Sequence, residues 1–429
     1  MRMRSIVVLL VALAAITAPV ALPRSGSPER CSFEGSGVEA THHPRATPVL
    51  GRFWIQETDS DEIAWVDPVT LRRLSPDPLA TPMQSSSWAV SPSGRILAIA
   101  LRRGIQIVDI RSLRPIGTLE MSDRLPRALT WLSNDLLAGV MEREVGVWRA
   151  DGARVHAIEL RADEHLMSSH ATKHRLLVLV ASHPRNEGPS RLLDVRRSGI
   201  GVVELDRVVG GYVPDVGDFG TSLTPDLAYD RSRGRAFVVQ PDGPVAEVDL
   251  DRRAVSYHSL GTSLLDGLAA RLVPPAEAKV SDWATSRTAW LGGGLLAISG
   301  ETGSALHPVA GFSAGITIVD TKDWSSCMLH TRASHVAVTG GSLLAWGGGD
   351  FGEHGGVGLI GYDLDSGRQW HLFGRQYLDM RFLGGYAYAI NSWHGWHVST
   401  VDVATGRVLT ERRGRPPTVL SVGSVLRAS

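Results

Sequence analysis

The sequence predicts an all-β fold, a single β-propeller built from four-stranded blades. Three observations lead to this prediction. Short apolar strands that end on an acidic residue recur along residues 49–429, most of them lie about 40 residues apart, and helical periodicity is nearly absent outside residues 263–272. Repeats of about 40 residues that each hold about four strands are typical of propeller blades.

Length and composition agree with a globular chain of this kind. A chain of 429 residues exceeds one ordinary domain, so it holds either two or three domains or one large repeat array. Hydrophobic residues at 43% and charged residues at 21% exclude a wholly disordered or fibrous chain. The 44 basic residues balance the 44 acidic ones, so no overall field favours nucleic acid, which we do not expect as a partner.

Residues 1–22 resemble a secretory signal peptide. Two arginines at the start are followed by an uncharged apolar run, 6–18, and then by small residues. Pro19 disfavours the nearest cleavage sites, and extending the run to Leu22 gives about 18 residues, enough for an uncleaved anchor. We therefore expect a secreted or extracytoplasmic protein that contacts a membrane only through this segment, if at all.

Residues 23–48 are rich in Pro, Gly and Ser and poor in bulky apolar residues, which is typical of a flexible linker. The chain has two cysteines, Cys31 in this linker and the distant Cys327. An oxidising compartment would allow them to form one disulfide. Two unpaired thiols, with Cys327 in a strand, are the alternative.

Eight copies of the repeated strand divide residues 49–429. They are IAWVD (63–67), IQIVD (105–109), VGVWR (145–149), IGVVE (200–204), VAEVD (245–249), ITIVD (316–320), LIGYD (359–363) and VSTVD (398–402). Seven copies close on an acid, and Arg149 closes the remaining one. A short acid at the end of a strand accepts N–H groups of the following turn, so we interpret these carboxylates as structural.

The closing positions lie 42, 40, 55, 45, 71, 43 and 39 residues apart, which gives eight blades by count. Seven blades are the alternative, because a weak copy, VGVWR or IGVVE, would then belong to an insertion. The first copy has three candidate strands, near 49–56, 61–67 and 71–75, and a lone strand is left at 417–423. We expect this C-terminal strand to join the first blade, since that removes both open edges of the ring.

Residues 91–121 (SPSGRILAIALRRGIQIVDIRSLRPIGTLEM) and 401–414 (VDVATGRVLTERRG) resemble the YVTN-repeat propellers, a part of the quinoprotein amine dehydrogenase-like propeller group. The similarity consists of a strand, a Ser-Pro-x-Gly-Arg turn, a strand, a Val-Asp strand, a Thr-Gly-Arg turn and a last strand. It covers residues 49–423 loosely and two or three repeats well. The resemblance implies the fold and not a function, because such propellers bind, scaffold or catalyse different things.

The long connections of the chain fall on one face of the predicted ring. If the strands of each blade are labelled A to D outward from the axis, B–C and D–A connections share one face, and A–B and C–D turns share the other. The long connections are predicted at 182–199, 214–223, 261–283, 300–314 and 349–356, all of them B–C or D–A. Loops that vary in length on one rim of a rigid scaffold are typical of a binding face.

Polar and aromatic residues on this face are the candidate ligand-binding residues. They are His183, Glu301, His307, Asp350, Glu353, His354, Trp393, His394, Trp396 and His397, with Arg185, Glu187, Asp215, Asp218 and Asp282 nearby. Carboxylates and imidazoles suit several divalent cations, although no spacing here is diagnostic. Paired tryptophans beside polar groups suit a saccharide or a peptide.

Two catalytic motifs match the sequence but not its context. GFSAG (311–315) fits the nucleophile elbow, which must lie between a strand and a helix, yet a strand follows it. GVGLIG (356–361) fits a dinucleotide-binding loop but also continues as a strand, so no helix N-terminus is there to hold a pyrophosphate. Neither motif is interpreted as functional.

Two functions remain. The first is an exported, monomeric propeller that binds a protein, a small molecule or a saccharide through the face of long loops. The second is a propeller enzyme of the lactonase or lyase kind that uses loop carboxylates and histidines, with a divalent cation. No cofactor is predicted for the first function, and no cofactor-specific motif supports a quinone-dependent redox role.

Overall fold

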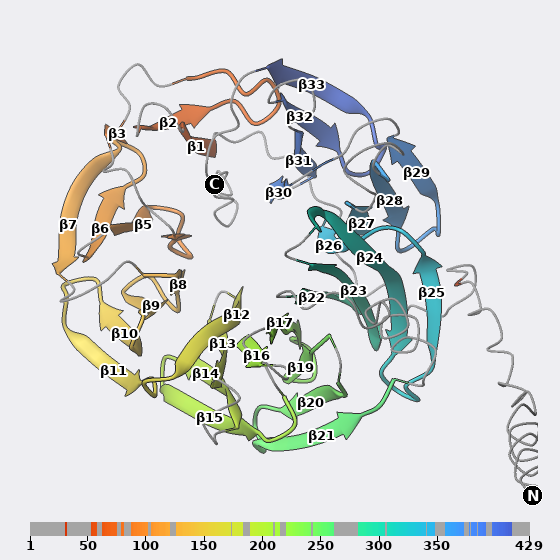
Figure 1. The fold of residues 1–429 in the computed structure, drawn as a ribbon. Helices are drawn as coiled ribbons and strands as arrows, with labels where there is room; N and C mark the ends of the chain where they lie inside the picture. Colours follow the sequence, from red (N-terminus) through yellow and green to blue (C-terminus); the bar gives the residue numbers. More distant parts are fainter. Residues whose placement is uncertain are drawn as a thin grey trace, which may run out of the picture.

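The computed structural model describes Cys31 and most of residues 53–413. Within that range it leaves out 58–61, 75–78, 81–86, 102–103, 121–125, 173, 183–188, 209–210, 215–219, 242, 261–281, 305–306, 340, 348–356, 373–376, 378, 384 and 392–396. The described residues form β-strands and turns arranged as a ring around a central axis (Figure 1). The chain is thus an all-β propeller.

The described strands form eight sheets, which we number as blades in chain order. Blade 1 holds β1 (Phe53–Glu57), β2 (Glu62–Val66) and β3 (Leu79–Ala80), and blade 2 holds β4 (Trp88–Val90), β5 (Ile96–Leu101), β6 (Gly104–Asp109) and β7 (Arg114–Glu120). Blade 3 holds β8 (Ala128–Trp131), β9 (Leu136–Val140), β10 (Glu144–Arg149) and β11 (Arg154–Glu159). Blade 4 holds β12 (Glu164–Thr172), β13 (Arg175–Ser182), β14 (Ser190–Arg196) and β15 (Gly199–Leu205).

The second half of the ring repeats the pattern with one addition. Blade 5 holds β18 (Asp226–Asp230), β19 (Arg235–Val239), β20 (Val245–Asp249) and β21 (Ala254–His258). Blade 6 holds β22 (Asp282–Gly292), β23 (Leu295–Ser304), β24 (His307–Asp320) and β25 (Ser326–His330), joined by β16 (Gly211–Pro214) and β17 (Gly220–Thr224). Blade 7 holds β26 (His335–Thr339), β27 (Ser342–Trp346), β28 (Leu359–Asp363) and β29 (Gln369–Leu372), and blade 8 holds β30 (Asp379–Leu383), β31 (Tyr386–Asn391), β32 (His397–Asp402) and β33 (Val408–Arg413).

Burial along each strand explains why these residues form blades. The second strand of blade 2, β5, has a continuous run of fully buried residues, Leu97 to Ala100, because both of its faces lie against neighbouring blades. The outermost strand, β7, is exposed at all but one position. Apolar residues therefore concentrate in the middle strands, and polar ones cover the perimeter of the ring.

The hydrophobic core is divided among the junctions between blades. Each of the eight clusters of buried residues joins two consecutive sheets. One of them joins blade 1 to blade 8 through Val66 and Leu71 on one side and Tyr388 and Val398 on the other. The Tyr388 hydroxyl also donates a hydrogen bond to the Pro68 carbonyl at 2.9 Å. The two ends of the described ring thus meet, and the count of eight blades is correct rather than seven.

The first blade differs in detail from the prediction. Its third strand was expected at 71–75, where only a single bridge joins Arg73 to Val66, and β3 pairs with β2 further along, at Leu79–Ala80. Residues 417–423, which we expect to complete this blade, lie outside the described residues. That strand exchange remains a prediction.

Blade 4 corrects one of the eight copies. IGVVE (200–204) was predicted to be the third strand, with Glu204 as its closing acid, but it lies in the outermost strand, β15. The third strand is β14. Its closing position is the residue that pairs with Arg175, the first residue of β13, and this residue is Arg196. The pattern of strands that end on an acid misses β14, because β14 ends on an arginine, and indicates the neighbouring β15 instead. The predicted long connection 182–199 is therefore reduced to 183–189.

The turn between the third and fourth strands is the most regular feature of the ring. The closing aspartates accept turn N–H groups as predicted: Asp67 Oδ1 accepts from Val69 and Thr70 at 3.0 and 2.7 Å. The hydrogen bond from the Thr70 N–H is the main reason that the pKa of Asp67 lies below its ordinary value. Four residues after each of six closing aspartates the backbone has a positive φ, at Leu71, Leu113, Arg253, Trp324, Gly367 and Gly406.

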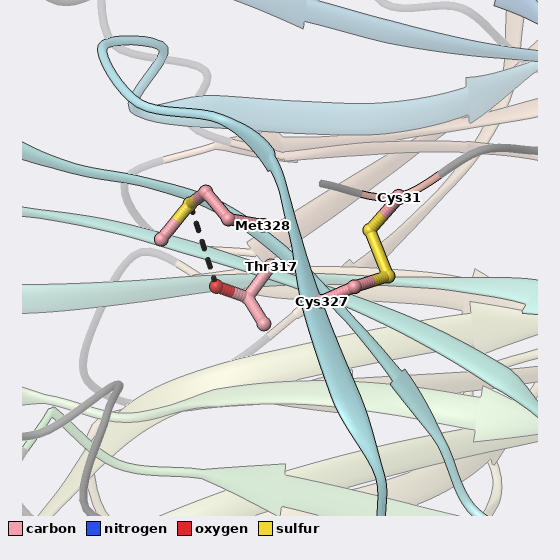
Figure 2. Close-up of a disulfide and its surroundings, with 4 residues drawn as sticks. All are labelled: Cys31, Thr317, Cys327 and Met328. Carbon is pink, nitrogen blue, oxygen red and sulfur yellow. Dashed lines mark hydrogen bonds between the residues drawn. A yellow bond between two sulfur atoms is a disulfide. The ribbon is translucent and has the colours of Figure 1, made fainter. Parts of the chain in front are cut away.

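A disulfide joins Cys31 to Cys327 on β25, the outermost strand of blade 6 (Figure 2). The Cys31 N–H also donates to the Met328 carbonyl at 3.3 Å. The segment that carries Cys31 is thereby attached to the perimeter of the ring, 296 residues away along the chain. Among the described residues, no helix is long and apolar enough to cross a membrane.

Candidate functional site

The face that carries the B–C and D–A connections, here the loop face, is elaborated most at blade 6. Strands β22, β23 and β24 have 11, 10 and 14 residues, whereas the corresponding strands in blades 5 and 7 have 5 residues each. The predicted loop 300–314 is in fact the paired continuation of β23 and β24, with Glu301 opposite Ser313. These strands extend the sheet at its loop-face end.

A hairpin from another connection widens this extension. Strands β16 and β17, which lie between blade 4 and blade 5 in the sequence, pair with each other, and β17 then pairs in parallel with the start of β22. The described residues of the predicted loop 214–223 belong to these two strands. A hairpin that precedes blade 5 in the sequence thus completes a six-stranded sheet in blade 6.

Glu301 lies in a polar cluster at the junction of blades 6 and 7. The Ser334 hydroxyl donates to Glu301 Oε1 and lies 2.9 Å from His335 Nδ1, and this nitrogen lies 3.4 Å from Glu301 Oε1. The His335 ring stacks on Trp346 with a centroid distance of 5.4 Å. Gly347, with φ +78°, leaves room for the cluster, because a Cβ there would lie 2.5 Å from Ser334 Oγ.

The hydrogen bonds assign roles within this cluster. A hydroxyl donates one hydrogen bond, so Ser334, which donates to Glu301, accepts from His335, and Nδ1 of His335 carries a proton. Ser334 is fully buried and thus unsuited to attack a substrate, whereas the side chains of His335 and Glu301 are 23% and 28% exposed. The arrangement presents a carboxylate and an imidazole side by side on the loop face.

A second polar cluster joins the innermost strands of blades 4, 5 and 6. Asp226, the first residue of β18, accepts from the Ser168 hydroxyl at 2.7 Å and from the Thr288 N–H at 2.8 Å. Burial lowers the pKa of His170 on β12, and Asp226 opposes this shift. Both oxygens of Asp226 are used within the protein, so we interpret the cluster as a brace between three blades.

Of the predicted ligand-binding residues, only Glu301 and His397 have described side chains. His397 begins β32, and its Nδ1 lies 3.1 Å from Glu411 Oε1 on the neighbouring β33. His307 begins β24, and Asp282 begins β22, but only their backbone is described. The other predicted residues lie outside the described part of the chain: His183, Asp350, Glu353, His354, Trp393, His394 and Trp396, with Arg185, Glu187, Asp215 and Asp218.

The structure joins Glu301 to two residues that sequence reasoning missed, Ser334 and His335. His335 is the first residue of β26, and Ser334 directly precedes it. A usable signal existed, because a histidine at the first position of an innermost strand lies at the loop-face end of its blade.

The two rejected motifs lie in strands, as their contexts indicated. Ser313 lies inside β24, and its hydroxyl accepts from the Gly315 N–H at 3.0 Å. Residues 359–361 of the glycine-rich motif belong to β28. Within the described residues, no group of three or more His, Cys, Asp or Glu side chains is arranged to hold a metal ion.

Among the comparisons with known proteins, one solved structure supports the fold. No protein-family model and no curated protein matches the chain. The structure of the dihydro-heme d1 dehydrogenase NirN in complex with DHE aligns with a TM-score of 0.56 at 12% identity, over 87% of this chain and 75% of that one. The computationally designed protein Ika8 aligns with a TM-score of 0.46 at 13% identity, over 77% of this chain and 88% of that one. Sqt1 of Saccharomyces cerevisiae aligns with a TM-score of 0.46 at 10% identity, over 76% and 83%.

At these identities the similarity to NirN shows a shared fold and no more. The expectation of a β-propeller fold therefore holds, while the resemblance to the quinoprotein amine dehydrogenase-like group is not tested by these comparisons. The finer assignment to YVTN repeats remains a prediction.

Proposed function

We propose that the protein is an exported β-propeller that binds a ligand or a protein partner through its loop face. The observation that carries this proposal is the six-stranded sheet of blade 6. Two strands inserted between blades 4 and 5 extend it, and neither inserted strand belongs to the sheet of blade 5. Binding residues are commonly found on segments that a rigid scaffold positions, and this hairpin is such a segment.

The chemistry of the described residues on this face fits binding. Glu301 and His335 offer a carboxylate and an imidazole to solvent, and the buried Ser334 fixes their relative positions. Polar groups held in place before binding cost less entropy when a partner arrives. The face thus has both an extended backbone platform and fixed polar contacts.

The Cys31–Cys327 disulfide supports the proposal of export, since disulfides persist in oxidising compartments. Cell fractionation followed by thiol trapping tests this part. We expect the protein outside the cytoplasm with no free thiol until a reductant is added. Recovery in the cytoplasm with two free thiols would contradict it.

The binding part is tested by replacing residues 211–224 with a short Gly-Ser linker. The hairpin pairs only with itself and the start of β22, so the ring is expected to fold. We expect the variant to capture at least tenfold less partner from the extracytoplasmic fraction than the wild type does. Arg111→Gln, in an exposed turn on the opposite face, serves as the control and should capture as much as the wild type. Equal capture by the hairpin variant would contradict the proposal.

A second function is favoured by one observation, the solvent-accessible pair of Glu301 and His335. A carboxylate beside an imidazole is suited to general acid–base catalysis. Under this reading the protein is a lactonase or lyase, with a divalent cation held by loop residues. The test is hydrolysis of a panel of lactones. Hydrolysis by the wild type that disappears in Glu301→Gln and in the presence of EDTA would favour this function. Absence of turnover by the wild type would exclude it for the lactones in the panel.

A further inference from the structure

A cavity lies between blades 4 and 5 on the face opposite the loops, where the A–B and C–D turns gather. Its volume is about 310 Å³, at the lower end of the range for small-ligand sites. It is lined by Asp194, Arg196, Ser198, Gly199, Ile200, Gly201, Val203, Leu250, Asp251 and Arg253. This is the place where blade 4 departs from the repeat by ending its third strand on Arg196. Departures from a repeat pattern are expected at functional sites.

The inner wall of the cavity is a network of charged groups. Asp194, only 5% exposed, lies 3.0 Å from Arg175 Nε and 2.6 Å from the Arg196 guanidinium. Arg196 also contacts Asp251 at 3.0 Å. Arg175 donates to the Tyr229 hydroxyl at 2.5 Å and lies over that ring, 5.2 Å from its centroid. The buried carboxylate is therefore held in one position by fixed partners.

Arg253 occupies the positive-φ position of its turn, as in the other blades that close on an aspartate, but its side chain is not packed like those of the other non-glycine residues there. Its φ of 57° is costly for a residue with a side chain. At the equivalent turn positions Leu71 and Leu113 are buried, and Trp324 packs against Phe237 and His258. The Arg253 side chain is exposed and makes no hydrogen bond or ion pair with any described residue.

The Arg253 guanidinium lines the cavity beside Gly201. Its Nη2 and Nε atoms lie 3.6 and 3.7 Å from the point where a Cβ at Gly201 would be, and Asp194 Cβ lies 3.8 Å from the same point. A Cβ at position 201 would thus be in van der Waals contact with both residues, and a longer side chain there would extend into the space beside the unpaired guanidinium.

The charges define the chemistry of an occupant. Three arginines (175, 196 and 253) and two aspartates (194 and 251) face the cavity or form its wall, which leaves one positive charge without a counterpart. A guanidinium binds a carboxylate with two parallel hydrogen bonds. The Asp251 carboxylate and the Ser198 hydroxyl are acceptors for hydroxyl groups, and Ile200, Val203 and Leu250 supply apolar contact. Both oxygens of Asp194 are used by Arg175 and Arg196, so this carboxylate fixes the wall of the cavity.

We propose that this cavity binds a small hydroxylated carboxylate of the sugar-acid class, with its carboxylate on Arg253 and its hydroxyls toward Asp251 and Ser198. The site lies on the face opposite the proposed partner-binding surface and does not depend on it. Binding there would also hold blades 4 and 5 together, because each blade supplies part of the lining.

Isothermal titration with D-glucuronate tests the proposal, with D-glucose and inorganic phosphate as comparison ligands. We expect saturable binding of glucuronate, at least tenfold weaker binding of glucose, and at least tenfold weaker binding of glucuronate by Arg253→Gln. The matched control is Arg252→Gln, since Arg252 is the adjacent arginine, has a side chain that is 83% exposed and does not line the cavity. It should bind glucuronate within twofold of the wild type.

A second variant separates binding from folding. In two other blades the equivalent turn position is a glycine, Gly367 or Gly406. Arg253→Gly should therefore unfold at the same or a higher urea concentration than the wild type, while it loses glucuronate binding. No saturable binding by the wild type, or equal losses in the two glutamine variants, would overturn the proposal. If glucose binds as tightly as glucuronate, the proposed role of the charge is overturned. If phosphate binds as tightly as glucuronate and also requires Arg253, the sugar-acid class is overturned. A clear loss of stability in Arg253→Gly would show a structural role instead.

Discussion

Removing the Cys31–Cys327 disulfide tests how the N-terminal segment is attached to the ring. The perturbation is the double substitution Cys31→Ala and Cys327→Ala. The two cysteines are 296 residues apart, and linking them restricts nearly the whole unfolded chain. In the chain-entropy treatment this restriction raises the free energy of the unfolded state by about 5.7 kcal/mol.

The net effect is smaller because the link also restricts the folded state. If residues 23–48 are the flexible linker that composition predicts, the folded chain must close about 22 residues between Cys31 and β1, at a cost of about 3.4 kcal/mol. The difference is about 2.3 kcal/mol of stability lost on removal. For a propeller of about 380 residues the unfolding entropy converts this into a decrease of about 3 °C in Tm.

The assay is thermal and urea unfolding of the wild type and the double variant, followed by tryptophan fluorescence. Wild type treated with a reductant serves as the control and should match the double variant. A change of less than about 0.5 kcal/mol, or no effect of the reductant, would refute the reasoning. A loss near 6 kcal/mol would show that the segment before β1 is already held in place without the disulfide.

Three further predictions concern the ring itself. Gly406→Ala should destabilise the protein by about 2 kcal/mol or more in urea unfolding, since its φ is +70° and the new Cβ would lie 2.4 Å from the Trp370 ring. Asp109→Ala should cost about 1 kcal/mol at pH 7, as measured by the same unfolding assay. The pKa of Asp109 is lowered, chiefly by a turn N–H, so its stabilisation is complete above about pH 4 and the cost should shrink as the pH falls below that value. Arg191→Met should cost about 3–5 kcal/mol, because it leaves Glu164, 3% exposed, without its bidentate partner.

Controls keep these measurements specific. Gly117→Ala has no heavy atom within 4 Å of its new Cβ and should change stability by less than about 0.5 kcal/mol. An equal loss in both glycine variants would contradict the role of Trp370. Adding Glu164→Gln to Arg191→Met should recover part of the loss, and no recovery would argue against an uncompensated carboxylate.

The fold could be predicted because each blade repeats the same local solution. A fully buried second strand, an acid that closes the third strand and a turn with a positive φ all leave marks at fixed spacing in the sequence. The prediction failed at blade 4, where Arg196 takes the place of the usual aspartate. Position in the sheet, set by pairing with Arg175, decided the strand there, and no local pattern shows that pairing.

The sites were less accessible to sequence reasoning because each is assembled from separate blades. Glu301 was selected as a loop residue, yet its partners Ser334 and His335 come from the next blade. The cavity on the opposite face joins residues of β14 and β15 to a turn about 50 residues later. Arg253 is one of many arginines in the sequence, and only its unpaired position beside Gly201 distinguishes it.

The central functional proposal, binding through the loop face, is tested most directly by photo-crosslinking. A benzoylphenylalanine placed at Ser313, on the extended part of β24, reports on the loop face, and one at Arg114, on the exposed β7, reports on the perimeter. After irradiation in the intact extracytoplasmic fraction, we predict a discrete crosslinked product from position 313 and none from position 114. Crosslinking from position 114 alone, or equally from both positions, would contradict the proposal.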